Sequence, residues 1–174
     1  MRILTILAVL TLLLSVQAVT ADTHDPYKHF FNETFGDFAE EVKTARAEGK
    51  QGVLIFFEMD ECPFCHFMKT NVLNRPDVQE YYRQNFLSYA VDIEGDIEIT
   101  DFAGRQMTQK DFSFKENRVR ATPVIAFYDL EGKEIFRHTG RTSGAEEFLL
   151  MGRFVAEGAY KQMPFTKFKR SHKK

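Results

Sequence analysis

The chain has 174 residues, of which 44% are hydrophobic, and its formal net charge at pH 7 is −2. This composition fits one domain with an ordinary core and excludes a chain that is disordered throughout. The near-neutral charge argues against a basic nucleic-acid-binding surface. Two cysteines are too few for a scaffold held together by several disulfides.

The first 21 residues have the pattern of a secretory signal peptide. Arg2 gives a weakly positive start, residues 3–16 are almost entirely apolar, and the small residues Ala18 and Ala21 suit a cleavage site. The apolar run is shorter than the ~20 residues that a membrane-spanning helix needs. The sequence therefore predicts export with cleavage of this segment, and an uncleaved membrane anchor is the alternative.

A polar lead-in over residues 22–33 precedes the first predicted helix. That helix is indicated by apolar residues at helical spacing and is expected to end at Gly49. Its apolar residues are Phe35, Phe38, Val42 and Ala45. Residues 53–57 then form a short, continuous apolar run, which is typical of a strand buried on both faces.

A second helix is predicted to begin at the two cysteines, Cys62 and Cys65. Pro63 suits its first turn, and apolar residues continue the helical spacing as far as Leu73. Asp77 is then expected to cap a short helix. Residues 86–93 have the apolar character of another buried strand.

The second half of the chain predicts a hairpin, a helix, two further strands and a final helix. A short strand or hairpin is expected around residues 97–102. The following helix, over residues 108–117, has Thr108 and Asp111 at capping-box spacing. Residues 124–128 and 134–139 predict an antiparallel hairpin, and Ser143 is expected to cap the last helix.

This order of elements predicts a single α/β domain with a mixed sheet. Early strands that alternate with helices pair in parallel, whereas the closing hairpin is antiparallel. We assign the domain to residues 22–160 and a basic tail to residues 161–174. The tail carries five Lys and Arg residues between 167 and 174, and it could weakly contact an anionic membrane surface or an acidic partner. A mobile, solubilising end is the favoured interpretation.

Two features of the sequence belong together. A buried strand leads into Cys62-x-x-Cys65 at a helix start, and Thr122-Pro123 precedes a terminal hairpin and helix. In this combination the chain resembles the thioredoxin superfamily. The resemblance covers about residues 35–158, and it implies the thioredoxin fold, in which helices flank a central mixed sheet. Within the superfamily the chain is most similar to SoxW-type exported thioredoxin-related proteins. The stretches that carry this closer similarity are Glu61-Cys62-Pro63-Phe64-Cys65, Val91-Asp92-Ile93, Ala121-Thr122-Pro123 and residues 154–160.

Cys62 and Cys65 are the predicted catalytic residues. A thiolate attacks a disulfide, and the N–H groups and dipole at a helix N-terminus favour the anionic form of Cys62. Cys65, one turn along, would then attack the mixed disulfide and release the substrate. Cys62 is therefore the expected nucleophile and Cys65 the expected resolving thiol.

The resemblance implies that the Thr122–Pro123 peptide bond is cis and faces the two cysteines. In the superfamily this loop holds an extended substrate backbone and leaves no room for a metal at the thiols. Thr122 and Pro123 are therefore the predicted substrate-binding residues, and no metal site is expected. An ordinary trans proline at the start of an edge strand is the alternative.

Two residues of the predicted site depart from the thioredoxin pattern. Glu61 stands where the family usually has Trp, and Phe56 stands where it has a buried Asp that assists proton transfer. Glu58 is a candidate substitute for that Asp, with a solvated carboxylate as the alternative.

Two features near the motif have opposite effects on the pKa of Cys62. The acidic residues Glu58, Asp60 and Glu61 disfavour a thiolate, but direct contact with helix N–H groups is expected to lower the pKa of Cys62 overall. His66 could donate to the thiolate, although a solvent-facing position is favoured.

The predicted function is an exported thiol–disulfide oxidoreductase that reduces protein disulfides. The SoxW-type resemblance implies a reductase whose dithiol is regenerated by a membrane electron-donor protein. We expect a periplasmic monomer that needs no cofactor and binds no nucleic acid. Pro63 and Phe64 are expected to tune the redox potential of the cysteine pair. Because this dipeptide begins with Pro, an oxidase or isomerase is the alternative function. Two alternatives lie outside the oxidoreductases, namely a metal-binding protein and a noncatalytic binding module.

Overall fold

The computed structural model describes residues 24–172. The predicted signal peptide lies outside the described residues. In chain order the elements are α2 (Pro26–His29), α3 (Phe38–Ala47), β1 (Gly52–Glu58), α4 (Pro63–Asn71), α5 (Pro76–Asn85), β2 (Phe86–Asp92), β3 (Glu98–Thr100), β4 (Gln106–Thr108), α6 (Gln109–Asp111), the π-helix η1 (Phe112–Glu116), β5 (Val124–Tyr128), β6 (Glu134–Thr139), α7 (Ala145–Ala156), the 3-10 helix η2 (Ala159–Lys161) and α8 (Phe165–Ser171).

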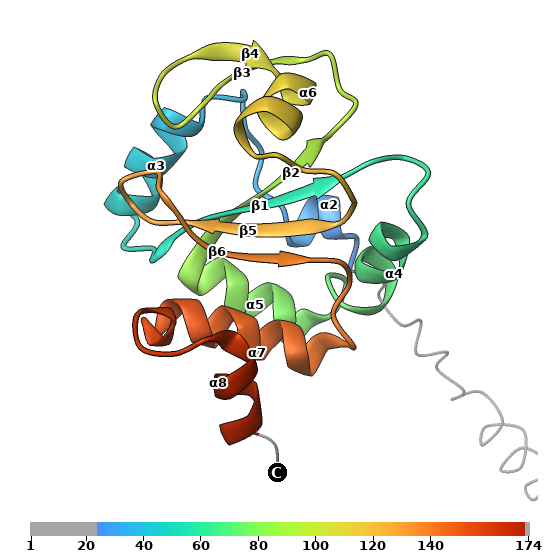
Figure 1. Cartoon of the computed structure of the whole chain (residues 1–174), viewed down its shortest axis with the longest axis vertical. Helices are drawn as coiled ribbons and strands as arrows, with labels where there is room; N and C mark the ends of the chain where they lie inside the picture. The colour runs from blue at the N-terminus through green and yellow to red at the C-terminus, as the bar shows by residue number, and fades with distance from the viewer. Residues whose placement is uncertain (1–23, 173–174) are drawn as a thin grey trace, which may run out of the picture.

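Four strands form the central sheet in the order β2-β1-β5-β6. β1 and β2 are parallel and are joined by a crossover through α4 and α5. β5 runs antiparallel to both β1 and β6. The sheet is therefore mixed, and helices lie on both of its faces (Figure 1). The predicted fold class is confirmed.

β1 is buried on both faces because successive side chains of a strand point to opposite sides. Leu54 and Phe56 pack in the core beneath α4, α5 and α7, together with residues such as Met68. Val53 and Ile55 pack in the second core, beneath α3 and η1. β1 ends at Glu58, and α4 begins at Pro63, just beyond that end.

The lead-in was predicted as a polar segment, and this is wrong for residues 26–31. Residues 26–29 form α2, and Phe30 and Phe31 are buried in the core. The ring of Phe30 lies 5.4 Å from that of Tyr82 and 5.9 Å from that of Phe148, between centroids. Two apolar residues inside a polar stretch carry no periodicity, so the sequence pattern did not reveal them.

Three details of the predicted helix starts are also wrong. Phe35 lies before α3 and is fully exposed rather than part of the helix face. The N-cap of α5 is Arg75 followed by Pro76, and Asp77 lies in the first turn, where it binds the Arg75 guanidinium. The N-cap of α7 is Gly144 without a side-chain cap. In each case a neighbouring residue is the N-cap of the helix instead.

The predicted hairpin is present but extends further along the chain. β3 pairs with β4, so the hairpin spans residues 98–108 rather than 97–102. Thr108 caps the following helix as predicted, because its hydroxyl accepts a hydrogen bond from the N–H of Asp111 at 3.1 Å. This hairpin and α6 cover the same face of the sheet as α3 (Figure 1).

Helix α8 packs on the domain, contrary to the mobile end favoured from sequence. α8 buries Phe168, whose ring lies 5.3 Å from that of Phe154 on α7. The ammonium of Lys169 binds the carboxylate of Glu147 at 2.7 Å. In residues 24–172 no helix combines the length and the apolar character needed to cross a bilayer.

The Lys169–Glu147 pair predicts an acid-sensitive contact between α8 and α7. Burial alone would raise the pKa of Glu147, but the hydrogen bonds from Lys169 and Ser143 outweigh it and lower the pKa from 4.5 to about 2. A lowered folded-state pKa stabilises the fold above pH 4.5, and this stabilisation is lost as the pH falls towards 2. Because Lys169 is partly exposed, we expect a loss of about 1–2 kcal/mol.

Urea unfolding of Glu147→Gln at pH 6 and at pH 2.5 measures this contribution. The variant is expected to lack this pH-dependent component, whereas Glu146→Gln, which changes an exposed carboxylate in the same turn, retains it. Equal pH dependence in wild type and Glu147→Gln would contradict the assignment.

Candidate active site

The two cysteines lie at the N-terminus of α4, directly after the loop that follows β1. Cys62 is the N-cap residue and Pro63 begins the helix, as predicted. The two sulfurs form a disulfide, and the Cα atoms are 5.2 Å apart. Cys62 is 7% exposed and Cys65 only 1%, so Cys62 is the more accessible of the two to an incoming sulfur atom.

The backbone of α4 contacts the sulfur of Cys62 directly. The N–H of Cys65 donates a hydrogen bond to Cys62 Sγ at 3.0 Å. The first N–H groups of a helix have no partner within the helix, and here one of them is directed at the sulfur. The same donor would stabilise a thiolate at Cys62 when the disulfide is reduced.

The loop containing Thr122 and Pro123 lies at the same end of the sheet as the cysteines. β5 begins at Val124, which pairs in antiparallel register with Phe57 near the end of β1. The chain therefore enters β5 where it leaves β1 for the cysteine motif. The Thr122–Pro123 bond is cis, as the resemblance implied. The carbonyl of Pro123 accepts a hydrogen bond from the N–H of Gly140 at 2.8 Å, which joins this loop to the end of β6.

An aromatic and cationic surface adjoins the disulfide. Phe64, between the cysteines, is 54% exposed. The guanidinium carbon of Arg141 lies 4.4 Å from the ring centroid of Phe67 and 5.9 Å from that of Phe64. Both distances lie within the range of a cation–π contact. Phe64 is one of the residues predicted from sequence, whereas Arg141 is not.

Glu58 is buried rather than solvated, so the alternative of a solvated carboxylate is wrong. Its residue exposure is 7%. One carboxylate oxygen accepts a hydrogen bond from the Lys69 ammonium at 2.7 Å, and the other accepts one from the Tyr27 hydroxyl at 2.6 Å. Lys69 also donates to the Tyr27 oxygen at 3.0 Å. We call these three residues the Glu58 network.

The Glu58 network connects three elements through charged and polar groups. Glu58 ends β1, Lys69 lies on α4 one turn beyond Cys65, and Tyr27 belongs to α2. Partial burial opposes the charge of Lys69, but the bonds to Glu58 and Tyr27 outweigh it and raise the pKa of the ammonium. Burial and the bond to Glu58 raise the pKa of the Tyr27 hydroxyl. At neutral pH, therefore, Lys69 is charged and Tyr27 is a hydrogen-bond donor.

The Glu58 network includes neither Phe56 nor the other polar residues around the motif. Phe56 is fully buried, and its ring lies 5.8 Å from that of Phe31, so an apolar contact fills the position of the usual Asp. Asp60 and Glu61 are exposed in the loop before Cys62. His66 is exposed on α4, in agreement with the favoured interpretation.

Three residues near the motif were missed from sequence. Lys69 could have been found, because a residue four positions after Cys65 lies on the same helix face. Tyr27 and Arg141 gave no such signal, because each is brought to the motif only by the tertiary fold. Tyr27 binds Glu58 across 31 residues of sequence, and Arg141 contacts Phe64 across 77.

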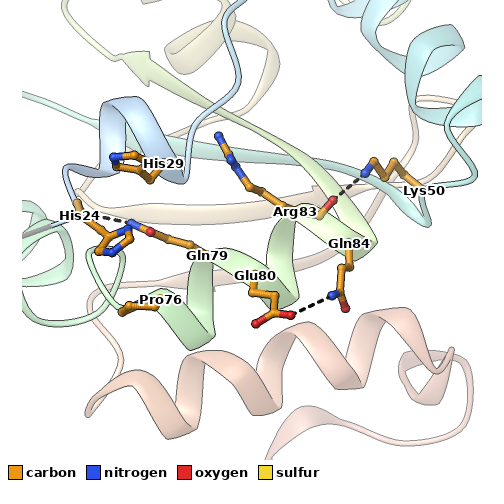
Figure 2. Close-up of a pocket in the computed structure, with 8 residues that line it drawn as sticks. All are labelled: His24, His29, Lys50, Pro76, Gln79, Glu80, Arg83 and Gln84. Atoms are coloured by element: carbon orange, nitrogen blue, oxygen red, sulfur yellow. Dashed lines mark hydrogen bonds between the residues drawn. The ribbon is translucent and has the colours of Figure 1, made fainter. Parts of the chain in front are cut away.

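A separate hollow lies between the start of the described chain and α5 (Figure 2). Its lining includes the cationic or titratable side chains of His24, His29, Lys50 and Arg83, and the Lys50 ammonium is held by the carbonyl of Arg83 at 2.6 Å. None of the predicted site residues lines it. Within the described part of the chain, no three His, Cys, Asp or Glu side chains are grouped as metal ligands.

Several solved structures share this fold. A thioredoxin-fold protein from Helicobacter pylori is 23% identical, with a TM-score of 0.58 over 70% of this chain and 82% of that one. A putative disulphide-isomerase from Bacteroides thetaiotaomicron is 22% identical, with a TM-score of 0.55 over 73% and 92%. A thioredoxin from Thermus thermophilus is 24% identical, with a TM-score of 0.53 over 68% and 83%. These similarities concern the fold alone.

The sequence comparison identifies the family. No curated protein sequence is significantly similar to the chain. Residues 38–156, more than half of the chain, match the family of thioredoxin-like domains, and this range contains the cysteine pair and the Pro123 loop. The chain therefore belongs to the thioredoxin-like domain family.

Proposed function

We propose that this protein is an exported thiol–disulfide oxidoreductase that reduces disulfides in proteins. The observation that carries the proposal is the Cys62–Cys65 pair at the start of α4, with a backbone N–H donated to the sulfur of Cys62. A redox-inactive binding module has no need for this arrangement, because a bridge over a three-residue separation adds little to the stability of the fold.

The proposed reaction transfers two electrons from the cysteine pair to the substrate. The Cys62 thiolate attacks one sulfur of the substrate disulfide, a Cys62–substrate disulfide forms, and the first substrate thiolate leaves. Cys65 then loses its proton and attacks the sulfur of Cys62, and the second substrate thiolate leaves. The products are a substrate dithiol and the Cys62–Cys65 disulfide, so no other cofactor is required.

The direction of electron flow is proposed from the resemblance to SoxW-type proteins. That resemblance implies a membrane electron-donor protein that returns two electrons to the Cys62–Cys65 disulfide after each turnover. The signal-peptide pattern of residues 1–21 supports export, and a bacterial periplasm is the proposed location. We propose that the protein acts there as a monomer, with Thr122 and Pro123 holding the substrate backbone beside Cys62.

An oxidase is the second candidate, and one observation favours it. The dipeptide between the cysteines begins with Pro63, unlike the Gly-Pro of thioredoxin. The two directions can be compared in one pair of assays at pH 7. We expect the dithiol protein to reduce insulin disulfides faster than the disulfide protein oxidises unfolded, reduced ribonuclease. The opposite order would replace the reductase with an oxidase.

A further inference from the structure

An arginine beside the disulfide has no role in the reaction proposed above. Arg141 follows Gly140, whose N–H donates to the carbonyl of Pro123 at 2.8 Å. It precedes Thr142, whose N–H and hydroxyl contact Sδ of Met68 on α4 at 3.4 and 3.5 Å. The backbone on one side of Arg141 is thus attached to the Pro loop, and on the other side to the helix that carries the cysteines.

The side chain of Arg141 is held over the rings next to the cysteines. Its guanidinium carbon lies 4.4 Å from the ring centroid of Phe67 and 5.9 Å from that of Phe64. Stacking on a ring face leaves the edge of a guanidinium, which carries the N–H groups, free to bind other groups. A long side chain that is oriented in this way loses less conformational entropy when it binds a ligand.

Most of the donors of Arg141 are unused. A guanidinium has five N–H donors. Within the described chain Arg141 forms one hydrogen bond, from Nη1 to the carbonyl of Thr142 at 3.3 Å. Among residues 24–172, Arg141 forms no ion pair. By contrast, Arg75 binds a carboxylate of its own chain through two hydrogen bonds. Arg141 therefore presents a cation to solvent beside the disulfide.

The charged side chains around the motif act in opposite ways on an approaching anionic group. Asp60 and Glu61 are exposed in the loop before Cys62 and repel an anionic group. Arg141 attracts one, and its planar fork matches the two oxygens of a carboxylate. Arg141 is thus the group beside the disulfide that can attract an acidic side chain of a peptide approaching Cys62.

We propose that Arg141 determines substrate specificity by binding an Asp or Glu side chain near the reacting cysteine of a peptide segment. Phe64, exposed between the cysteines, contacts an apolar neighbour of that cysteine. The proposal rests on the proposed function, because it concerns the same thiol–disulfide exchange. Arg141 takes no part in the covalent steps, and it acts on the affinity for the approaching peptide.

Three fluorescence-quenched peptide disulfides test this specificity. Their sequences differ in one residue beside the cysteine, which is Glu, Gln or Lys, and the second-order rate constant is measured with the full-length dithiol protein. We expect the Glu peptide to react about fivefold faster than the Lys peptide at low ionic strength, with a smaller ratio in high salt. Arg141→Gln is expected to remove the preference or to invert it slightly, because Asp60 and Glu61 remain.

Matched variants separate specificity from other effects of the charge. Arg170→Gln removes an exposed arginine on α8 and should keep the wild-type ratio. If Arg141 only stabilised the thiolate, its loss would slow all three peptides by one factor and leave the ratio unchanged, and this would overturn the proposal. Reaction without any charge preference in wild type would also overturn it but leave the oxidoreductase intact. Failure of all three peptides to react would contradict both.

Discussion

Replacing Cys62 by serine is expected to abolish disulfide reduction. A serine hydroxyl does not attack disulfides, so the rate should fall by roughly three orders of magnitude or more, to the uncatalysed background. Because Cys65 is 1% exposed, it is not expected to take over as the attacking thiol. The measurement is reduction of insulin disulfides by the variant at pH 7, with a circular dichroism spectrum to show that the fold is retained.

Cys65→Ser is the matched control, because it removes the same atom from the other cysteine. This variant should still form the Cys62–substrate disulfide but should not release it, since no resolving thiol is present. Mass spectrometry of the quenched reaction is expected to detect a stable adduct with Cys65→Ser and none with Cys62→Ser. If the adduct forms at Cys65 in Cys62→Ser instead, the roles of the two cysteines are reversed.

Replacing Lys69 by methionine is expected to destabilise the protein by about 2–3 kcal/mol at pH 7. The change keeps an apolar stem but leaves the buried carboxylate of Glu58 without its cation, and an unpaired buried charge is strongly unfavourable. Lys69 is partly exposed, with a side-chain exposure of 24%, so the expected loss is below that of a fully buried pair. Urea unfolding followed by circular dichroism measures it.

A double-mutant cycle identifies the cause of this loss. Removing both charges, in Glu58→Gln with Lys69→Met, should cost less than the sum of the two single changes. Tyr27→Phe should cost less than Lys69→Met, because it removes a hydrogen bond and leaves the ion pair. Additive effects of Glu58→Gln and Lys69→Met would show that the two groups do not interact, and would contradict the Glu58 network.

The central part of the fold could be predicted because its signals are local in the sequence. A short, continuous apolar run is typical of a strand buried on both faces, and Pro63 directly after Cys62 indicates a helix start. The cysteine pair was therefore located from a few neighbouring residues. The cis bond before Pro123 required the family resemblance, since spacing alone left an ordinary trans proline open.

The parts that could not be predicted depend on contacts between distant residues. Burial of Glu58 is decided by Lys69 and by Tyr27, which lies 31 residues earlier in the chain. A carboxylate at a strand end gives the same sequence signal whether it is solvated or buried. For the same reason, the aromatic residues Phe30 and Phe168 appeared to belong to polar segments, although the fold brings both into the core.

The reduction potential of the Cys62–Cys65 pair tests the proposed reductase most directly. The protein is equilibrated with defined ratios of reduced and oxidised glutathione at pH 7, and free thiols are counted by alkylation and mass spectrometry. Cys62→Ser serves as the blank. We expect a value near that of thioredoxin, about −270 mV. A value near that of DsbA, about −120 mV, would contradict the reductase and favour an oxidase. Two thiols that never form a disulfide would contradict any redox function of the pair.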